Sequence, residues 1–187
     1  MKKILLMGNP NVGKSALFNR LTGAKVIESN YPGTTVDYTK GYIILDGKEI
    51  EIIDVPGTFS LNPKDKAEEV AVKMLEENKG SLVICVLDST KIERGLYLAL
   101  DIIERGYPVI IALNMWDVAK DKNINIDVKE LERLLGVPVV PTVAISGEGV
   151  KHLVSRIKEA RRGKIEDIVR RMQDGETKSR AKMGTHR

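Results

Sequence analysis

The chain has 187 residues and a mass of 20.8 kDa, and its 42% hydrophobic and 30% charged residues indicate one folded domain and exclude a disordered chain. Its net charge of +4 comes mostly from residues 163–187, which carry seven Lys/Arg and four Asp/Glu, so the nearly neutral remainder is not typical of a nucleic-acid-binding protein. The longest apolar runs hold six or seven residues, too few for a membrane span of about 20.

Short apolar runs alternate with amphipathic stretches along most of the chain. Six runs predict strands, and most are apolar throughout, as expected of strands covered by helices on both faces. These strands are expected over Ile4–Met7, Tyr42–Leu45, Ile50–Ile53, Leu82–Leu87, Val109–Leu113 and Val137–Val140. Helices are expected over Lys14–Leu21, Ala67–Glu77, Gly95–Arg105, Val128–Leu135 and Val150–Arg161. The pattern predicts an α/β fold, with a mostly parallel six-stranded sheet flanked by helices and one antiparallel hairpin at Asp46-Gly47.

The periodic pattern weakens toward the end of the chain. Residues 1–162 are predicted to form one domain, and residues 163–187 a helical or linker segment that is partly disordered. Within this segment, Ile165–Met172 predicts one or two helical turns, and the polar stretch Gln173–Arg187 is expected to fray.

A phosphate-binding sequence follows the first predicted strand, at the carboxyl end where parallel sheets bind their ligands. It matches G-x-x-x-x-G-K-[ST] and consists of Gly8, Asn9, Pro10, Asn11, Val12, Gly13, Lys14 and Ser15. The glycines let successive backbone N–H groups face phosphate oxygens, and the start of the helix adds its positive end. Lys14 supplies a cation for the outer phosphates, and the Ser15 hydroxyl suits Mg²⁺.

A D-x-x-G pattern follows the third predicted strand and consists of Asp54, Val55, Pro56 and Gly57. Asp54 is suited to hold a Mg²⁺-bound water and the Gly57 N–H to meet a terminal phosphate, so this loop senses whether that phosphate is present. A loop-like stretch between the two motifs contains Gly33, Thr34 and Thr35, and its threonines are candidates to complete the Mg²⁺ shell.

An N-x-x-D pattern follows the fifth predicted strand and consists of Asn114, Met115, Trp116 and Asp117. The Asp117 carboxylate can accept the N1–H and N2–H₂ donors of guanine, whereas adenine presents a mismatched edge. Asn114 can either bond N7 of the base or brace the loops, and Met115 can cover the base face. After the last predicted strand, a backbone N–H of Ala144 or of a neighbour, Val143 or Ile145, is expected to contact guanine O6.

In this order and spacing, the motifs define a GTPase domain. Their particular residues resemble those of the cytosolic G domain of ferrous iron transport protein B, over most of the chain. The resemblance rests on Gly8–Ser15, Tyr31–Val36, Asp54–Leu61, Asn114–Asp117, Leu96–Leu98 and Leu135–Val140. It implies a small-GTPase-like P-loop NTPase fold. It further implies a domain that hydrolyses GTP to GDP and regulates a ferrous iron membrane transporter, and it favours Thr35 over Thr34 as the Mg²⁺ ligand.

Hydrolysis is expected to depend on Lys14, Asn11, Thr35 and Gly57, which position the phosphates and neutralise developing charge. Where many GTPases carry a glutamine, this chain has Thr58, which predicts slow intrinsic turnover. The resemblance implies that Asn11 helps to bind K⁺ between the α- and γ-phosphates, where an arginine finger would act. The alternative is that Asn11 only shapes the loop.

The family joins this domain to a helical regulatory domain and a membrane-spanning part. We therefore expect a cytoplasmic domain of a longer membrane protein, with a free-standing relative as the alternative.

The single cysteine, Cys85, allows no internal disulfide, which fits a reducing compartment. With two His and no clustered ligands, the chain is not expected to bind iron itself; nucleic acid is not expected as a partner, and self-association is left open. Two alternative functions stay open: an RNA-associated GTPase of ribosome assembly, and a nucleotide-dependent interaction module with negligible hydrolysis.

Overall fold

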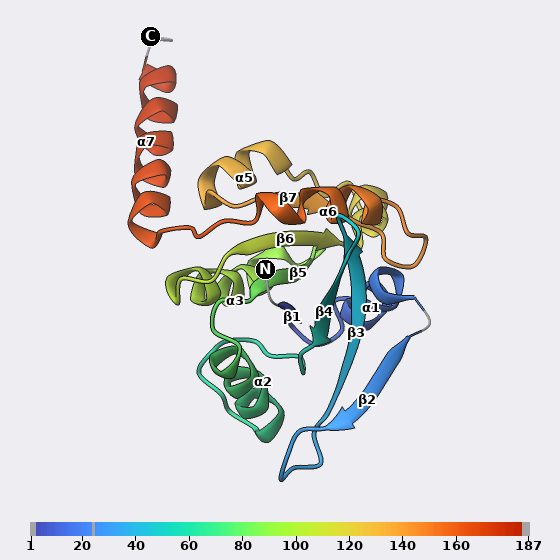
Figure 1. Cartoon of the computed structure of the whole chain (residues 1–187). Helices are drawn as coiled ribbons and strands as arrows, with labels where there is room; N and C mark the ends of the chain where they lie inside the picture. The colour runs from blue at the N-terminus through green and yellow to red at the C-terminus, as the bar shows by residue number, and fades with distance from the viewer. Residues whose placement is uncertain (1–2, 24, 185–187) are drawn as a thin grey trace.

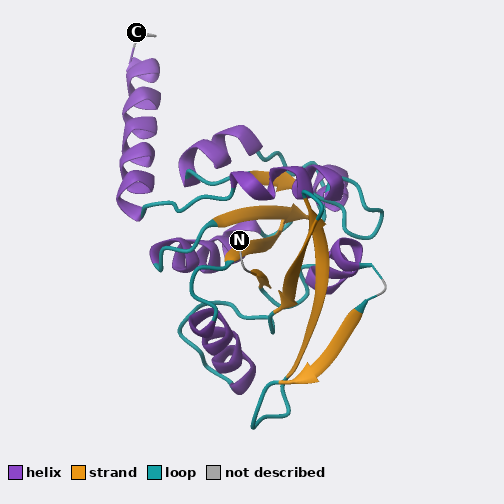
Figure 2. Cartoon of the chain, viewed as in Figure 1, coloured by secondary structure: helices purple, strands orange, loops and turns teal. Residues whose placement is uncertain are grey.

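One seven-stranded sheet with helices on both faces forms the body of the protein (Figure 1, Figure 2). The computed structural model describes residues 3–23 and 25–184. The strands lie in the order β2-β3-β4-β1-β5-β6-β7. Their bounds are β1 Lys3–Gly8, β2 Val26–Asn30, β3 Asp37–Leu45, β4 Lys48–Asp54, β5 Leu82–Asp88, β6 Val109–Asn114 and β7 Val139–Pro141.

The strand pairing confirms the predicted α/β class and corrects the number of strands. β1 pairs in parallel with β4 and β5, and the parallel order continues through β6 to β7, while β3 is antiparallel to both β2 and β4. The hairpin at Asp46-Gly47 joins β3 to β4 as expected. The sheet has seven strands rather than six because β2 was not predicted. Its residues lie at the sheet edge, are half-buried or exposed, and include Glu28, Ser29 and Asn30, so no apolar run marks them.

Except for the short helix Trp116–Asp121, which was not predicted, the helices follow the predicted ranges with differences at their ends. They are α1 Lys14–Thr22, α2 Lys66–Glu77, α3 Ile92–Glu104, α4 Trp116–Asp121, α5 Val128–Leu135, α6 Val150–Arg156, the 3₁₀ turn η1 Ile157–Glu159, and α7 Ile165–Gly184. Side chains at the N-caps start two of them: Asp65 accepts the Glu68 N–H at 2.9 Å, and Asp127 accepts the Glu130 N–H at 2.9 Å. Gly136, with φ 69°, ends α5 in the left-handed region.

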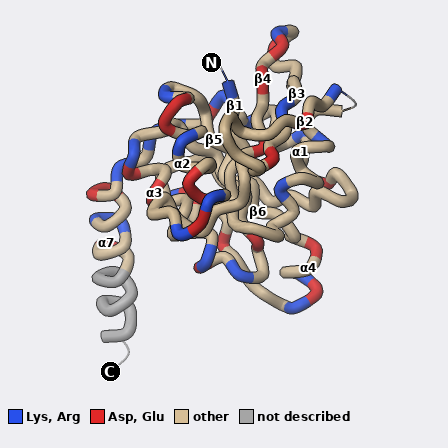
Figure 3. The backbone as a smooth tube through the Cα atoms, turned by 90° about the horizontal axis from the view of Figure 1, so that it is seen from below, with Lys and Arg blue, Asp and Glu red and all other residues tan. Residues whose placement is uncertain are grey.

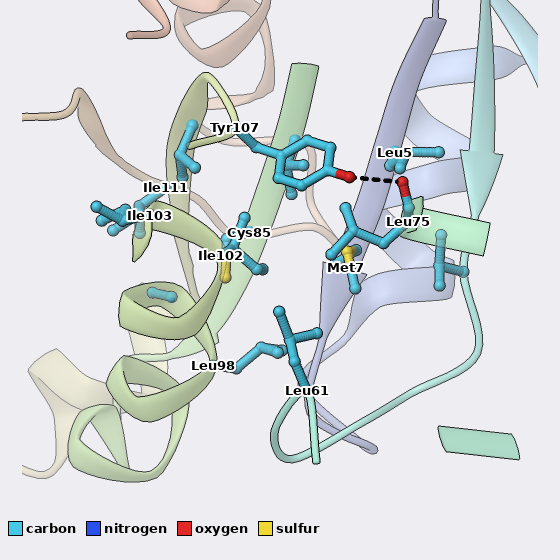
Figure 4. Close-up of a cluster of buried hydrophobic side chains, with 14 of the residues drawn as sticks. Leu5, Met7, Leu61, Leu75, Cys85, Leu98, Ile102, Ile103, Tyr107 and Ile111 are labelled. Atoms are coloured by element: carbon cyan, nitrogen blue, oxygen red, sulfur yellow. Dashed lines mark hydrogen bonds between the residues drawn. The ribbon is translucent and has the colours of Figure 1, made fainter. Parts of the chain in front are cut away.

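The core consists of two apolar layers, one on each face of the sheet. Because side chains alternate along a strand, Leu5 and Met7 face the layer under α2 and α3, whereas Ile4 and Leu6 face the layer under α1 and α6. The Tyr107 hydroxyl crosses the first layer and donates to the Leu75 carbonyl at 2.8 Å (Figure 4). Cys85 is fully buried in the same layer, and this burial raises the pKa of its thiol to about 12, so the thiol is held protonated and unreactive.

The last helix, α7, is longer than predicted. It runs to Gly184 and extends away from the body (Figure 1), whereas a frayed chain was expected from Gln173 onward. Its first turns dock on the body, because Ile168 is buried and Arg171 Nη1 donates to the Leu134 carbonyl at 3.1 Å. Residues 185–187 lie outside the described residues. No helix among residues 3–184 combines the length and the apolar character that crossing a membrane requires.

An ion pair joins α5 to α6 next to the end of the sheet. Arg156 binds Glu132 with both terminal nitrogens, each at 2.9 Å, and the Val139 N–H donates to the same carboxylate at 2.9 Å. The hydrogen bonds from Arg156 are the main reason why the pKa of Glu132 lies below its ordinary value. The charged form of Glu132 therefore stabilises the fold. Basic and acidic residues are otherwise interspersed over the body (Figure 3).

Replacing Glu132 with Gln is expected to lower the free energy of unfolding at pH 7 by about 1–2 kcal/mol, because a charge-assisted bidentate pair is lost. A carboxyl with a lowered folded pKa stabilises above its unfolded pKa of about 4.3, and this contribution is lost as pH falls through the folded value. Urea denaturation at pH 7 and at decreasing pH measures the difference, which is expected to shrink below about pH 4. Glu130→Gln is the control, because its partner Arg133 is exposed on the same helix. Equal losses for both variants contradict the prediction.

Candidate functional site

The backbone of the loop between β1 and α1 restricts which residue types can occupy several of its positions. Asn11 and Gly13 have positive φ values of 65° and 81°. A Cβ on Gly13 would lie 2.3 Å from Asn114 Nδ2, and one on Gly8 would lie 2.7 Å from the Val86 carbonyl oxygen, so both positions require glycine. The loop encloses a hollow of about 430 Å³ at the carboxyl edge of the sheet. This hollow is lined by Asn9, Pro10, Asn11, Gly13, Lys14, Ser15, Ala16 and Gly57.

Two of the residues that line this hollow, Lys14 and Ser15, contact the side chain of Asp54 beside it. The Lys14 ammonium forms an ion pair with Asp54 Oδ1, and the Ser15 hydroxyl donates to Asp54 Oδ2 at 3.3 Å. The side chains of Lys14 and Asp54 are only 11% and 10% exposed, so their charges are poorly screened. A hydroxyl beside a carboxylate is a pair of hard oxygen donors, which is the chemistry that Mg²⁺ prefers. The lysine supplies the charge that phosphate oxygens require.

The D-x-x-G segment is held directly against the phosphate loop. The Thr58 N–H donates to the Gly8 carbonyl at 3.1 Å, and a Cβ on Gly57 would lie 3.1 Å from the Pro10 nitrogen. Gly57 therefore borders the hollow, with Pro56 before it half-buried. The Val55 side chain is fully buried, and its N–H donates to the Leu6 carbonyl at 3.1 Å, so this residue anchors the segment to the sheet.

Thr58 turns away from the hollow. It is fully buried, and its hydroxyl donates to the Ser60 carbonyl at 2.7 Å. The residue after Gly57 therefore offers no side chain that could orient a water there.

The structure does not bring Gly33, Thr34 or Thr35 to this hollow, since none of them lines it. Their loop instead reaches the C-terminal end of α2 (Figure 1), where the Tyr31 hydroxyl donates to Glu77 Oε1 at 2.5 Å. That hydrogen bond raises the pKa of Tyr31 to about 12. Thr34 is engaged within the turn, since its hydroxyl donates to the Tyr31 carbonyl at 2.9 Å and accepts the Val36 N–H at 3.1 Å. Thr35 is exposed.

Asn114 braces three segments, which is one of its two predicted roles, while its bond to N7 of the base stays a prediction. Its Nδ2 donates to the Val12 carbonyl at 2.9 Å, and its Oδ1 accepts the Ala144 N–H at 3.0 Å and the Thr142 hydroxyl at 3.2 Å. The side chain is buried, and its carbonyl oxygen and one of its two amide N–H donors are engaged by protein partners. The phosphate loop and the loop after β7 are thus tied to one residue at the end of β6.

Asp117 leaves its carboxylate available. It lies in the first turn of α4, is exposed, and forms no hydrogen bond or ion pair within residues 3–175. Met115, with φ 58°, makes the turn that places α4 behind it. Trp116 packs against the core, and its N–H donates to the Thr142 carbonyl at 3.2 Å, which ties it to the loop after β7.

The loop after β7 differs in detail from the prediction. The N–H groups of Val143 and Ala144 are both engaged, with the Glu148 carbonyl at 2.9 Å and with Asn114. Neither is therefore available to a base. The Ile145 N–H makes no hydrogen bond to another described residue, and its side chain is 84% exposed. Of the three predicted candidates, Ile145 is the one that keeps a free backbone donor.

Two contributors to the site carry no sequence signal. Arg20, on the exposed side of α1, donates from Nε to the Ala144 carbonyl at 3.1 Å and from Nη2 to the Ile145 carbonyl. Glu68 is buried at the start of α2 and accepts the Phe59 N–H at 3.1 Å and the Lys64 N–H at 2.8 Å, which fixes the loop after Gly57. Neither belongs to a motif, so only the structure identifies them.

Asn9 and Asn11 line the same hollow with amide groups. Asn9 is 5% exposed, and its Oδ1 is the only buried side-chain polar atom in the described part of the chain without a hydrogen-bond partner. An unpaired buried oxygen is costly unless a ligand satisfies it. Asn11 is exposed at the mouth of the loop. An amide oxygen is a donor that suits a hard cation, and the K⁺ role of Asn11 stays a prediction.

A phosphate loop after β1, an aspartate at the end of β4 and an N-x-x-D motif that begins at the end of β6 lie together at one edge of a mostly parallel sheet. This fold and site define a P-loop nucleotide-binding domain of the GTPase class.

The comparisons identify the family within this class. A family model described as ferrous iron transport protein B matches residues 2–157, and the chain belongs to this family. The chain is 41% identical over 164 residues to an Fe(2+) transport protein A/Fe(2+) transporter FeoB fusion protein of Porphyromonas gingivalis, which covers 87% of this chain and 19% of that protein. It spans 21% of the Fe(2+) transporter FeoB of Salmonella typhimurium.

Solved structures of this family have the same fold. The cytosolic domain of L. pneumophila FeoB superimposes with a TM-score of 0.83 at 38% identity, covering 87% of this chain and 64% of that one. The cytosolic domain of the T. maritima FeoB iron transporter in its GMPPNP form gives a TM-score of 0.80 at 43% identity, covering 85% and 63%.

Proposed function

We propose that this chain is the regulatory domain of a ferrous iron membrane transporter, where it binds GTP, hydrolyses it to GDP and switches between the two states. The observation that carries the proposal is the brace at Asn114, which joins the phosphate loop to the base end of the site, where Asp117 is free. The forms in which the T. maritima relative was solved, with GMPPNP and with GDP, support a guanine nucleotide as the ligand.

At the phosphate end, the loop N–H groups and Lys14 hold the phosphates, and Ser15, Thr35 and Asp54 hold Mg²⁺, Asp54 through a water. When bound, Mg²⁺ supplies charge neutralisation at the phosphates. Thr35 lies outside the hollow, so its part requires the loop Tyr31–Val36 to leave α2 and close over the phosphates. Such ordering by the terminal phosphate is how switch loops signal its presence.

At the base end, the Asp117 carboxylate accepts two donors from guanine, and the free Ile145 N–H donates to O6. Calorimetry with GTP and ATP in Mg²⁺ tests the proposal directly. We expect GTP to bind at least about a hundredfold more tightly, because adenine would leave the Asp117 carboxylate without donors. Equal binding of the two nucleotides overturns it.

Turnover is expected to be slow and to depend on K⁺. The buried Thr58 hydroxyl is already engaged, so no side chain after Gly57 orients the attacking water. Replacing Asn11 with Ala is expected to abolish the stimulation of phosphate release by KCl over NaCl, while GDP affinity changes less than about threefold, because only an oxygen donor to the cation is removed.

Two variants control this experiment. Asn123→Ala changes another exposed asparagine with a positive φ, 55°, and is expected to leave the stimulation intact. Asn11→Gly preserves the positive φ without the side chain and is expected to lose the stimulation as Asn11→Ala does. Retained stimulation in Asn11→Gly indicates that Asn11 only shapes the loop.

The surroundings of the domain follow from the same proposal. Residues 1–162 form the G domain on the cytoplasmic side, and residues 163–187 lead from it toward the remainder of the transporter. Ferrous iron is the cargo of that remainder and is not bound here. A gel-shift with ribosomal RNA at two salt concentrations distinguishes this function from a role in ribosome assembly. We expect no shift at either concentration, whereas an RNA-binding protein would shift the RNA at low salt and lose it steeply as salt rises.

A further inference from the structure

We propose that Arg20 is a positioning residue for guanine recognition, which holds the Ala144–Ile145 segment so that the Ile145 N–H faces O6 of the base. The inference rests on the proposed function. Arg20 is on α1, the helix that begins at the phosphate loop, and its two contacts reach a loop 124 and 125 residues away in the sequence. A guanidinium presents several donors in one plane, so it can hold two neighbouring carbonyls at once.

The geometry of the peptide bond links these carbonyls to the N–H that matters. In a trans peptide, the carbonyl of one residue and the N–H of the next point in opposite directions. The structure has no cis peptide bond among its described residues. Because Arg20 Nε binds the Ala144 carbonyl, the Ile145 N–H points away from Arg20. The same holds for the N–H of Ser146, since Arg20 also binds the Ile145 carbonyl.

This peptide lies within a turn that the Gly147 N–H closes by donating to the Val143 carbonyl at 2.8 Å, but among the described residues only Arg20 donates to the Ala144 and Ile145 carbonyls. Asn114 holds the Ala144 N–H from the inside, and the Val143 N–H is bound by the Glu148 carbonyl, but both contacts precede the Ala144–Ile145 peptide. The Ile145 side chain is 84% exposed, so its packing does not orient the Ala144–Ile145 peptide. Arg20 has no carboxylate partner within residues 3–175, and the two carbonyls accept two of its five N–H donors.

The test separates the contact at O6 from the contact at the edge read by Asp117. The affinities of GDP, 6-thio-GDP and IDP are measured by fluorescence competition for the unaltered protein and for Arg20→Ala. In 6-thio-GDP a weaker acceptor, sulfur, replaces O6, whereas IDP keeps O6 and lacks the N2 amino group that Asp117 binds. For the unaltered protein, both analogues are expected to bind about tenfold or more weakly than GDP, since each loses one hydrogen bond in a desolvated site.

For Arg20→Ala, we expect GDP to dissociate about tenfold faster and the 6-thio-GDP penalty to fall to about twofold, while the IDP penalty is unchanged, because only the O6 donor has lost its orientation. Arg20→Lys is expected to be intermediate, since one ammonium cannot hold both carbonyls in a fixed geometry. Arg133→Ala removes one positive charge on α5 and is the control for net charge.

Two outcomes overturn the inference: GDP release and both penalties unchanged in Arg20→Ala, or GDP weakened with the 6-thio-GDP penalty intact, which indicates a merely structural role. A thermal melt of each variant reports any loss of folding. An unaltered protein without guanine preference refutes the proposed function itself, whereas a guanine-selective protein that is insensitive to Arg20→Ala refutes only the role of Arg20.

Discussion

Asp117→Asn is expected to weaken GTP binding at least about a hundredfold and to make XTP the preferred nucleotide. The Asp117 carboxylate offers two acceptor oxygens to the N1–H and N2–H₂ donors of guanine. An asparagine places an NH₂ group opposite the N2 amino group, so two donors face each other. Xanthine carries an oxygen at that position, which can accept the new NH₂ group.

The measurement is competition between GTP and XTP by calorimetry, for the unaltered protein and for Asp117→Asn. Since the Asp117 side chain is exposed and unpaired within residues 3–175, its replacement is expected to leave the melting temperature unchanged. Asp121→Asn, at the other end of α4 and also exposed, is the matched control and is expected to keep the preference for GTP. A variant at position 117 that still prefers guanine would remove Asp117 from base selection.

Lys14→Ala is expected to weaken GTP binding about a hundredfold or more and to reduce phosphate release to the background rate. The Lys14 ammonium is only 11% exposed and lies at the hollow beside Asp54 and Ser15. Loss of a poorly screened cation from a phosphate site removes charge-assisted hydrogen bonds worth about 3 kcal/mol together. It also leaves Asp54 without its ion-pair partner.

Calorimetry with GTP and a phosphate-release assay measure this effect, and a thermal melt distinguishes lost binding from lost folding. Lys158→Ala removes an equal charge from an exposed pair with Asp46 and is expected to bind GTP normally. If Lys14→Ala binds GTP within about threefold of the unaltered protein, the phosphate-loop assignment is wrong.

The positions of the motifs could be predicted from the sequence because they depend on topology. Gly8, Asp54 and Asn114 each end a buried strand, and the carboxyl ends of parallel strands meet at one edge of a sheet. The roles of single atoms could not be predicted in this way. Asn114 suits either a base or a brace by its chemistry, and only the structure shows the brace, through the 2.9 Å contact with the Val12 carbonyl.

The elements and residues that could not be predicted share one physical reason, which is that no local sequence pattern marks them. β2 lies at the sheet edge with exposed polar side chains, and α4 has six residues, too few for a helical period to be recognised. Arg20 lies on the exposed side of α1, where an arginine is ordinary, and its importance comes from contacts distant in sequence. The loop containing Thr35 follows a path beside α2 that no local pattern specifies.

The burial of Cys85 makes the protein well suited to site-specific labelling. It is the only cysteine of the chain, it is fully shielded, and its thiol stays protonated at neutral pH. A thiol introduced by Ile145→Cys would therefore react alone with a maleimide dye. Because the proposed contact of this residue uses its backbone and not its side chain, the dye would report the motion of the loop in real time without a second engineered change.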